Sequence, residues 1–161
     1  MTTASDGKTM EEWSEELQSV LGKSWPGPMM EVTTTSIRMF ARALGYSQPE
    51  FYNIEAARAK GYPNLLAPPG FMGFAVFDPT AEVDERGPWP TFARSLNGGM
   101  AFDVVEPVFA GDVLTSMRTA KSVVTRQSRM GTLLIRVSET VYTRQSDNKV
   151  VGRRRDTGIN Y

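Results

Sequence analysis

Residues 111–160 read GDVLTSMRTAKSVVTRQSRMGTLLIRVSETVYTRQSDNKVVGRRRDTGIN. The stretch is rich in Val, Thr, Leu and Arg, and apolar residues partly alternate with polar ones, as they do in half-buried strands. Turn-forming residues divide it at regular intervals. With the segment before it, this pattern predicts four strands of an antiparallel meander, over residues 91–105, 113–125, 133–143 and 149–159.

Upstream of these strands, residues 65–77 read LLAPPGFMGFAVF. Pro68 and Pro69 can open a helix, because the N–H groups of a first helical turn are unpaired in any case. Residues 71–77 are apolar on every side, which is typical of a buried helix. Since a sheet must cover its apolar face, we expect an α+β domain in which a curved antiparallel sheet wraps around this central apolar helix.

Residues 1–60 predict an N-terminal extension and further helices. An amphipathic helix over 10–21 follows a flexible tail, so that residues 1–28 form an extension and residues 29–161 the main domain. A short strand over 29–33 and a helix over 49–60 are also expected. Another helix starts at 34–36 and ends at Gly45, with a buried face composed of Ile37, Phe40, Ala41 and Leu44.

Composition excludes several classes of function. The 18 basic and 18 acidic residues cancel, so neither a nucleic acid nor a membrane is an expected partner. No apolar run approaches the roughly 20 residues of a membrane span, and residues 1–21 lack a signal-peptide pattern. The absence of cysteine excludes disulfides and permits the cytoplasmic location that we expect. We expect no cofactor and no metal.

The sequence also contains no histidine. It therefore cannot build a Ser-His or Cys-His nucleophile, an imidazole base or a His-ligated zinc site. Any chemistry must use carboxylates, Lys, Tyr, Ser, Thr or backbone dipoles, or a histidine that a partner supplies.

Three groups of residues carry a combined signature through their order and spacing. They are residues 37–45 with 49 and 56–62, residues 66–71, and residues 96–99 with 106–108 and 111–114. Together they resemble the MaoC-like, FAS1-like family of (R)-specific enoyl-thioester hydratases and dehydratases. The resemblance implies a hot-dog fold and reversible hydration of a 2-enoyl thioester that is linked to coenzyme A or to a carrier protein.

In catalytic members of that family a helix ends in Gly-Asp-x-Asn-Pro-x-His, and the Asp and His together activate water. Aligned on Gly45 and Pro49, this sequence has Tyr46 at the Asp position, Gln48 at the Asn position and Phe51 at the His position. A phenol is a poor base at neutral pH, and a phenyl ring transfers no proton. The resemblance therefore implies that this chain lacks the dyad and contains no catalytic residue.

The family uses two hot-dog units per active site, and in several systems one unit keeps the dyad while the other shapes the acyl tunnel. The resemblance implies that this chain is of the second kind, as an obligate dimer with a dyad-bearing partner or with itself. Met72 and Phe74 would add apolar surface. The expected substrate-binding residues are Tyr46, Gln48, Phe51, Tyr52, Pro69, Gly70, Phe71, Asn97, Gly98 and Gly99.

Several motifs have two interpretations. The helix start at Pro69 could present an oxyanion hole or open a core helix without a ligand. Residues 97–99 could admit a pantetheine arm or form a β-bulge, which we favour. Residues 153–155 could bind coenzyme A phosphates or lie on a solvated edge strand. Asp112 is expected to be a turn residue. Asp78, Glu82, Asp84 and Glu85 could supply a base or metal ligands, although a solvated loop is favoured.

Two other functions remain open. One is a self-sufficient homomeric hydratase or thioesterase that uses Tyr46, Glu50 or Asp78 in an unconventional site. The other is a non-catalytic protein that binds acyl-coenzyme A. Acyl length and class are not determined by the sequence.

Overall fold

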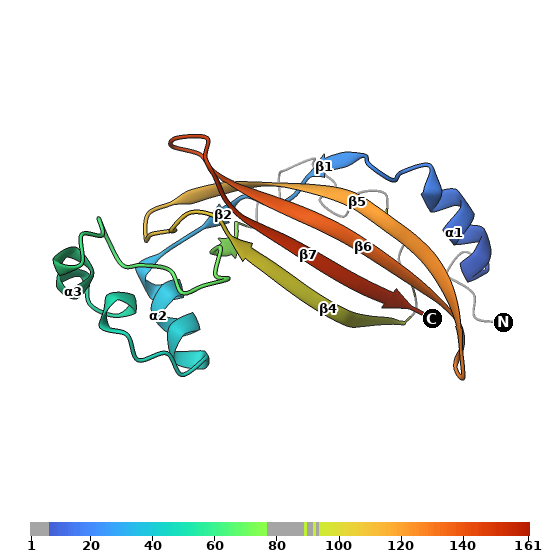
Figure 1. Ribbon diagram of the computed structural model, residues 1–161, viewed down its shortest axis with the longest axis horizontal. Coiled ribbons are helices and arrows are strands. Elements are labelled where there is room, and N and C mark those ends of the chain that lie inside the picture. Colours follow the sequence, from blue (N-terminus) through green and yellow to red (C-terminus); the bar gives the residue numbers. More distant parts are fainter. Residues whose placement is uncertain (1–6, 77–88, 90–91, 93) are drawn as a thin grey trace.

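A computed structural model describes residues 7–76, 89, 92 and 94–161, and long curved antiparallel strands dominate it (Figure 1). The sheet runs in the order β3-β2-β5-β6-β7-β4, and β1 also pairs with β5. Its strands are β1 (Ser24–Pro26), β2 (Met30–Glu31), β3 (Phe74–Ala75), β4 (Ser95–Val104), β5 (Val113–Ser128), β6 (Gly131–Arg144) and β7 (Val150–Asn160).

All four predicted long strands exist, but they do not form a simple meander. β4 pairs with β7 rather than with the next strand in sequence, β5. The connection after β4 crosses the end of the sheet, where the N–H groups of Val105 and Glu106 both donate to the carbonyl of Val151. Thr91 and Ala93, which belong to the first predicted strand, lie outside the described residues.

Bulges account for much of the curvature. The pairing register shifts between Asn97 and Gly99 in β4 and between Ala120 and Ser122 in β5. An extra residue in one strand bends that strand and increases its twist. We call the face that carries Thr140 and Tyr142 the inner face, because both side chains are buried there.

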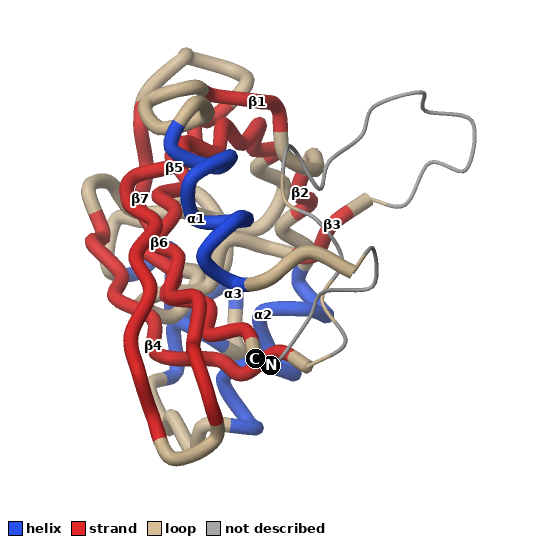
Figure 2. Tube along the Cα trace, turned by 90° about the vertical axis from the view of Figure 1, so that its right-hand side faces the viewer, coloured by secondary structure: helices blue, strands red, loops and turns tan. Residues whose placement is uncertain are grey.

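The amphipathic helix is confirmed as α1 (Met10–Gln18) and packs across β5 and β6 (Figure 2). Thr9 forms a capping box with Glu12, which satisfies two N–H groups at the helix start. The apolar stripe of α1 is buried in one cluster with Phe92, Val123 and Leu134. The extension therefore covers one end of the inner face, while the domain boundary after residue 28 stays a prediction.

The opposite end of the sheet carries the helices α2 (Thr34–Ala43), η1 (Pro49–Phe51) and α3 (Ile54–Ala59) (Figure 1). The predicted strand over 29–33 corresponds to β2, and the helix that follows is confirmed as α2, although Leu44 is exposed rather than buried. The single helix predicted over 49–60 is wrong. Asn53 adopts an extended backbone, and its side chain accepts from the Ala56 N–H, so a new helix begins at Ile54.

The prediction of a helix over 71–77 is also wrong: residues 71–76, the part of this segment that the structure describes, form no helix. Gly70 and Gly73 both have positive φ angles, 84° and 86°, which a right-handed helix does not allow. Phe74–Ala75 instead pairs with β2 as strand β3. A Cβ on Gly73 would lie 2.7 Å from the Glu31 carbonyl carbon, so this close pairing requires glycine. Across the described ranges, no helix is both long and apolar enough to span a bilayer.

Candidate functional site

A pocket of about 260 Å³ opens where the helical end meets the sheet. We call it the apolar pocket. Three segments form it: the end of η1, the chain leading into β3, and the connection after β4. Its lining comprises Phe51, Tyr62, Leu66, Ala67, Pro68, Pro69, Gly70, Phe71, Met72, Val104, Val105, Glu106, Pro107 and Val108.

The pocket brings together four of the predicted substrate-binding residues, namely Phe51, Pro69, Gly70 and Phe71. Phe51 and Phe71 are almost fully buried, and Phe71 packs 4.7 Å from the ring of Phe40 in α2. Such rigid aromatic walls are typical of sites that take an apolar ligand. Phe74, by contrast, is exposed and does not line the pocket.

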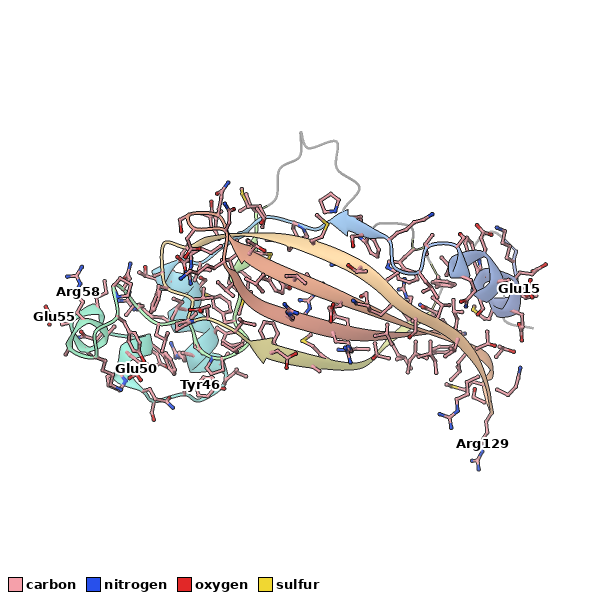
Figure 3. All side chains as sticks on the ribbon, turned by 45° about the horizontal axis from the view of Figure 1, so that its top comes forward. Glu15, Tyr46, Glu50, Glu55, Arg58 and Arg129 are labelled. Carbon is pink, nitrogen blue, oxygen red and sulfur yellow. The ribbon has the colours of Figure 1, made fainter. Side chains whose placement is uncertain are left out.

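Three other predicted residues, Tyr46, Gln48 and Tyr52, do not line the pocket. The ring of Tyr46 meets that of Phe51 edge-on at 5.7 Å, and the Tyr52 hydroxyl donates to the Tyr46 carbonyl at 2.6 Å. Gln48 is exposed and precedes the η1 turn, where its side chain accepts from the Ser47 N–H. Tyr46 therefore supports the pocket through Phe51 and lies at the helical end of the molecule (Figure 3).

Residues 97–99 do not line the apolar pocket. The register shift between Asn97 and Gly99 confirms the bulge. The Asn97 side chain accepts from the Gly99 N–H, and a Cβ on Gly98 would meet Ile159 at 2.9 Å. Access for a pantetheine arm at Asn97, Gly98 and Gly99 stays a prediction.

The helix start at Pro69, on which both the oxyanion-hole and the core-helix interpretations depend, is not formed. The described chain contains no helix there, and the Phe71 N–H donates to the Pro68 carbonyl within a turn. The helix-dipole part of the oxyanion-hole hypothesis is therefore wrong.

Glu106 and Tyr62 supply the polar chemistry of the pocket. Sequence reasoning assigned no role to either residue. Glu106 is half buried and follows the apolar end of β4. Its position in the pocket becomes apparent only from the folded structure. Glu106 is the acidic residue among those that line the pocket.

Glu50 is buried beside the pocket and forms an ion pair with Lys60, with 2.8 Å between Oε1 and Nζ. Its second oxygen, Oε2, has no hydrogen-bond partner in the described part of the chain. The hydrogen bond from Lys60 holds the pKa of Glu50 below its ordinary value of 4.5. The two partners come from η1 and from the end of α3, so the pair fixes these turns against each other.

Replacing Lys60 with Met is expected to lower the melting temperature at neutral pH by about 2–4 °C, because Glu50 stays buried and charged without its cation. Since the folded pKa is lowered, this stabilisation is complete above pH 4.5 and is lost as the pH falls through the lowered value. Thermal unfolding at successive pH values measures it. A Lys60→Arg control should retain it, and a Lys60→Met deficit that persists in strong acid would contradict the assignment.

The remaining motifs are resolved in part. Asp112 is a turn residue as predicted: it accepts from the Phe109 N–H at 2.9 Å and pairs with Arg144. The three arginines at 153–155 alternate between faces, but β7 lies between β6 and β4 and is not an edge strand. Asp78 and the other acidic residues of 82–85 lie outside the described residues.

A curled antiparallel sheet with few helices and an apolar pocket at one end defines the class of this chain as a hot-dog protein. Residues 19–153 match the model of the FAS1-like, dehydratase domain region, and the chain belongs to that family. A UPF0336 protein of Streptomyces griseus is 36% identical over 115 residues, which cover 66% of this chain and 72% of that protein.

Solved structures show the same fold. In the HadBC (3R)-hydroxyacyl-ACP dehydratase complex of Mycobacterium tuberculosis, a chain with 25% identity matches with a TM-score of 0.64, covering 88% of this chain and 97% of that one. A chain of the ChsH1–ChsH2 complex of the same organism matches with a TM-score of 0.67 and 17% identity, covering 94% and 95%. The MaoC-like, hot-dog resemblance and the fold class are thereby confirmed.

Proposed function

We propose that this chain is the tunnel-forming subunit of an acyl-thioester hydratase or dehydratase, and that a hot-dog partner supplies the Asp and His. One observation carries the proposal: Phe51 forms a wall of the apolar pocket in a chain that contains no histidine. Such a pocket can hold an acyl chain but offers no imidazole for the proton transfers of hydration. The substrate is an enoyl thioester of coenzyme A or of a carrier protein, and a cytoplasmic location remains a prediction.

The free edge of β4 supports a partner. Leu96, Met100 and Val104 are 48%, 58% and 52% exposed, and among the described residues β4 pairs on one side only. A long edge strand with apolar side chains is a template for pairing with another chain. HadBC and ChsH1–ChsH2 are complexes of two subunits, which fits a second hot-dog subunit on this edge.

The test is mild affinity purification of the tagged chain from its native cells, followed by identification of stoichiometric partners. The complex and the separated subunits are then assayed for loss of enoyl-thioester absorbance. The proposal expects a second hot-dog protein with Gly-Asp-x-Asn-Pro-x-His and activity in the complex alone. Recovery of the chain only with itself would contradict the partner assignment.

In that complex, Glu106→Gln is expected to change kcat by less than about 3-fold, because a general base contributes about 10²–10⁴-fold and Glu106 is not the base. Steady-state kinetics of the complex measures it. Glu50→Gln serves as the parallel variant for the other carboxylate near the pocket.

The alternative of a self-sufficient enzyme is favoured by the same two carboxylates. A homomer that hydrates enoyl thioesters, and that loses about 100-fold or more in kcat on Glu106→Gln, would establish it. Saturable thioester binding without turnover in any complex would instead indicate an acyl-thioester binding protein.

A further inference from the structure

A second, polar cavity lies on the inner face between the two apolar clusters of the sheet. It has a volume of about 220 Å³ and lies over the middle of β5, β6 and β7. We call it the arginine site. Its lining consists of Trp89, Arg118, Arg136, Ser138, Arg154, Asp156 and Gly158.

The strand register places the three arginines on one face. Arg118 pairs with Thr140, and Thr140 in turn pairs with Arg154, which forms one row across three strands. Arg136 pairs with Gly158 in a neighbouring row on the same face. Directly paired residues of adjacent strands lie about 4.5–5.5 Å apart at Cβ. Long guanidinium side chains therefore converge over this part of the sheet.

Positive charge at the site exceeds the negative charge that faces it. Asp156 is the carboxylate of the lining, and it is engaged by Arg154 at 2.8 Å. Glu139 lies on the opposite face, where it pairs with Lys121 and Arg155. Two guanidinium charges, those of Arg118 and Arg136, thus have no carboxylate among the described residues.

Buried polar atoms at the site also lack partners. Arg118 Nε and Thr140 Oγ1 are buried and have no hydrogen-bond acceptor or donor within the described chain, and Thr140 is only 2% exposed. Burial and the nearby Arg118 charge lower the pKa of Arg136. Unsatisfied buried groups and like charges cost free energy unless a ligand compensates them.

The position of Arg136 is fixed by its surroundings. Its guanidinium lies 5.1 Å from the ring of Trp89 and 5.5 Å from that of Phe92. A Cβ on Gly158 would come within 3.1 Å of Nε, so a larger residue at this position would make the Arg136 side chain shift by a few tenths of an ångström. A guanidinium held between rings keeps its planar N–H groups oriented for one acceptor, with little entropy to lose on binding.

We propose that Arg118, Arg136 and Arg154 bind the carboxylate of a ligand whose apolar part lies along the inner face. A planar guanidinium matches a carboxylate with two parallel hydrogen bonds. Apolar surface adjoins the site, because Phe102 stacks on Tyr142 at 6.2 Å next to Arg154. A carboxylate on an apolar stem satisfies both kinds of surface.

The arginine site lies further along β7 from the apolar pocket. A Cβ on Gly152 would meet Met72 of the pocket wall at 3.0 Å, and Asp156 of the arginine site follows four residues later. At the rise of a strand this separation is about 13 Å. Resting on the proposed function, the inference then names the substrate class: enoyl thioesters whose acyl chain ends in a carboxylate.

The first test measures the binding of octanoate to the purified full chain through the change in tryptophan fluorescence. Trp89 is a suitable reporter, because its ring lies 5.1 Å from the Arg136 guanidinium and meets the Trp25 ring edge-on at 6.0 Å. Octanamide is the neutral control, and inorganic phosphate is the anion without a stem. The proposal expects saturable octanoate binding that is at least about 10-fold tighter than that of either control.

Arg118→Gln and Arg136→Gln should each weaken octanoate binding about 10-fold and leave octanamide binding unchanged. Arg155→Gln, on the opposite face of β7, is the matched control and should bind as the wild type does. Circular dichroism verifies that all three variants fold. Absent binding, equal binding of phosphate, or an equal loss in Arg155→Gln would overturn the carboxylate site.

A second test separates this inference from the proposed function. The complex is assayed with a carboxy-terminated enoyl thioester and with its methyl-terminated counterpart of equal length. The expected preference for the carboxylate falls about 10-fold in Arg118→Gln. Hydration of both substrates at equal rates would overturn the carboxylate inference while the proposed function stands. Octanoate binding without hydration of either substrate would overturn the proposed function while the carboxylate site stands.

Discussion

The double variant Leu96→Glu/Met100→Glu is expected to weaken association with the partner at least about 100-fold. These side chains are 48% and 58% exposed on the edge strand β4, and neither lines the apolar pocket. Pairing there would force two carboxylates into an apolar contact, and charges on an edge strand oppose strand addition. At a fixed subunit concentration, hydration activity should fall in proportion.

Sedimentation of the purified subunits measures the association constant, and enoyl-thioester absorbance measures the activity. Met39→Glu/Met130→Glu is the matched control, because these methionines are 62% and 56% exposed and neither belongs to β4. If the β4 variant associates as tightly as this control, the interface lies elsewhere.

The second large effect concerns Gly73. Gly73→Ala is expected to destabilise the fold by about 3 kcal/mol or more, and to lower the melting temperature by about 6–12 °C. The new Cβ would be forced against the Glu31 backbone at a φ of 86°, where L-residues are disfavoured. Relief requires separating β2 from β3, because no flexible side chain can move aside.

Gly61→Ala is the control for this experiment. Gly61 has nearly the same φ, 84°, but a Cβ added there would have nothing within 4 Å. Its substitution should cost about 1–2 kcal/mol through backbone strain alone. The difference in unfolding free energy between the two variants measures the steric cost at Gly73. Equal losses of stability in both variants would show that the Glu31 backbone moves to make room for the new Cβ.

The long strands and α1 could be predicted from the sequence because their signal is local. Periodicity alone identifies Met10, Trp13 and Leu17 as one face of a helix, and all three are buried. Pairing partners are not a local property of the sequence. The sequence analysis therefore placed β4 beside β5 in a meander, whereas in the structure β4 pairs with β7.

The apolar run after Pro69 misled for a different reason. A short apolar segment between prolines and glycines is compatible with a buried helix and with an extended chain. Gly70 and Gly73 decided between them, because their backbone conformations with positive φ end any helix. The tertiary contact of Gly73 with β2 cannot be read from the segment itself.

The candidate site was predicted in part. Phe51 and Gly70 were found through a family motif, and the structure brings them to one pocket. Glu106 belonged to the family signature but was given no role in the site, and the inner-face arginines were scattered over three strands. Arg118, Arg136 and Arg154 become neighbours only through the register of β5, β6 and β7.

The strand order has a consequence for synthesis on the ribosome. β4 leaves the ribosome before the β5–β6 hairpin, yet its pairing strand, β7, follows that hairpin. Until β7 emerges, a nascent chain holds an apolar strand with neither edge paired, a state that is prone to aggregate. Chaperones that bind extended apolar segments can therefore bind β4 during the period between the synthesis of β4 and that of β7. This period ends when β7 pairs with β4.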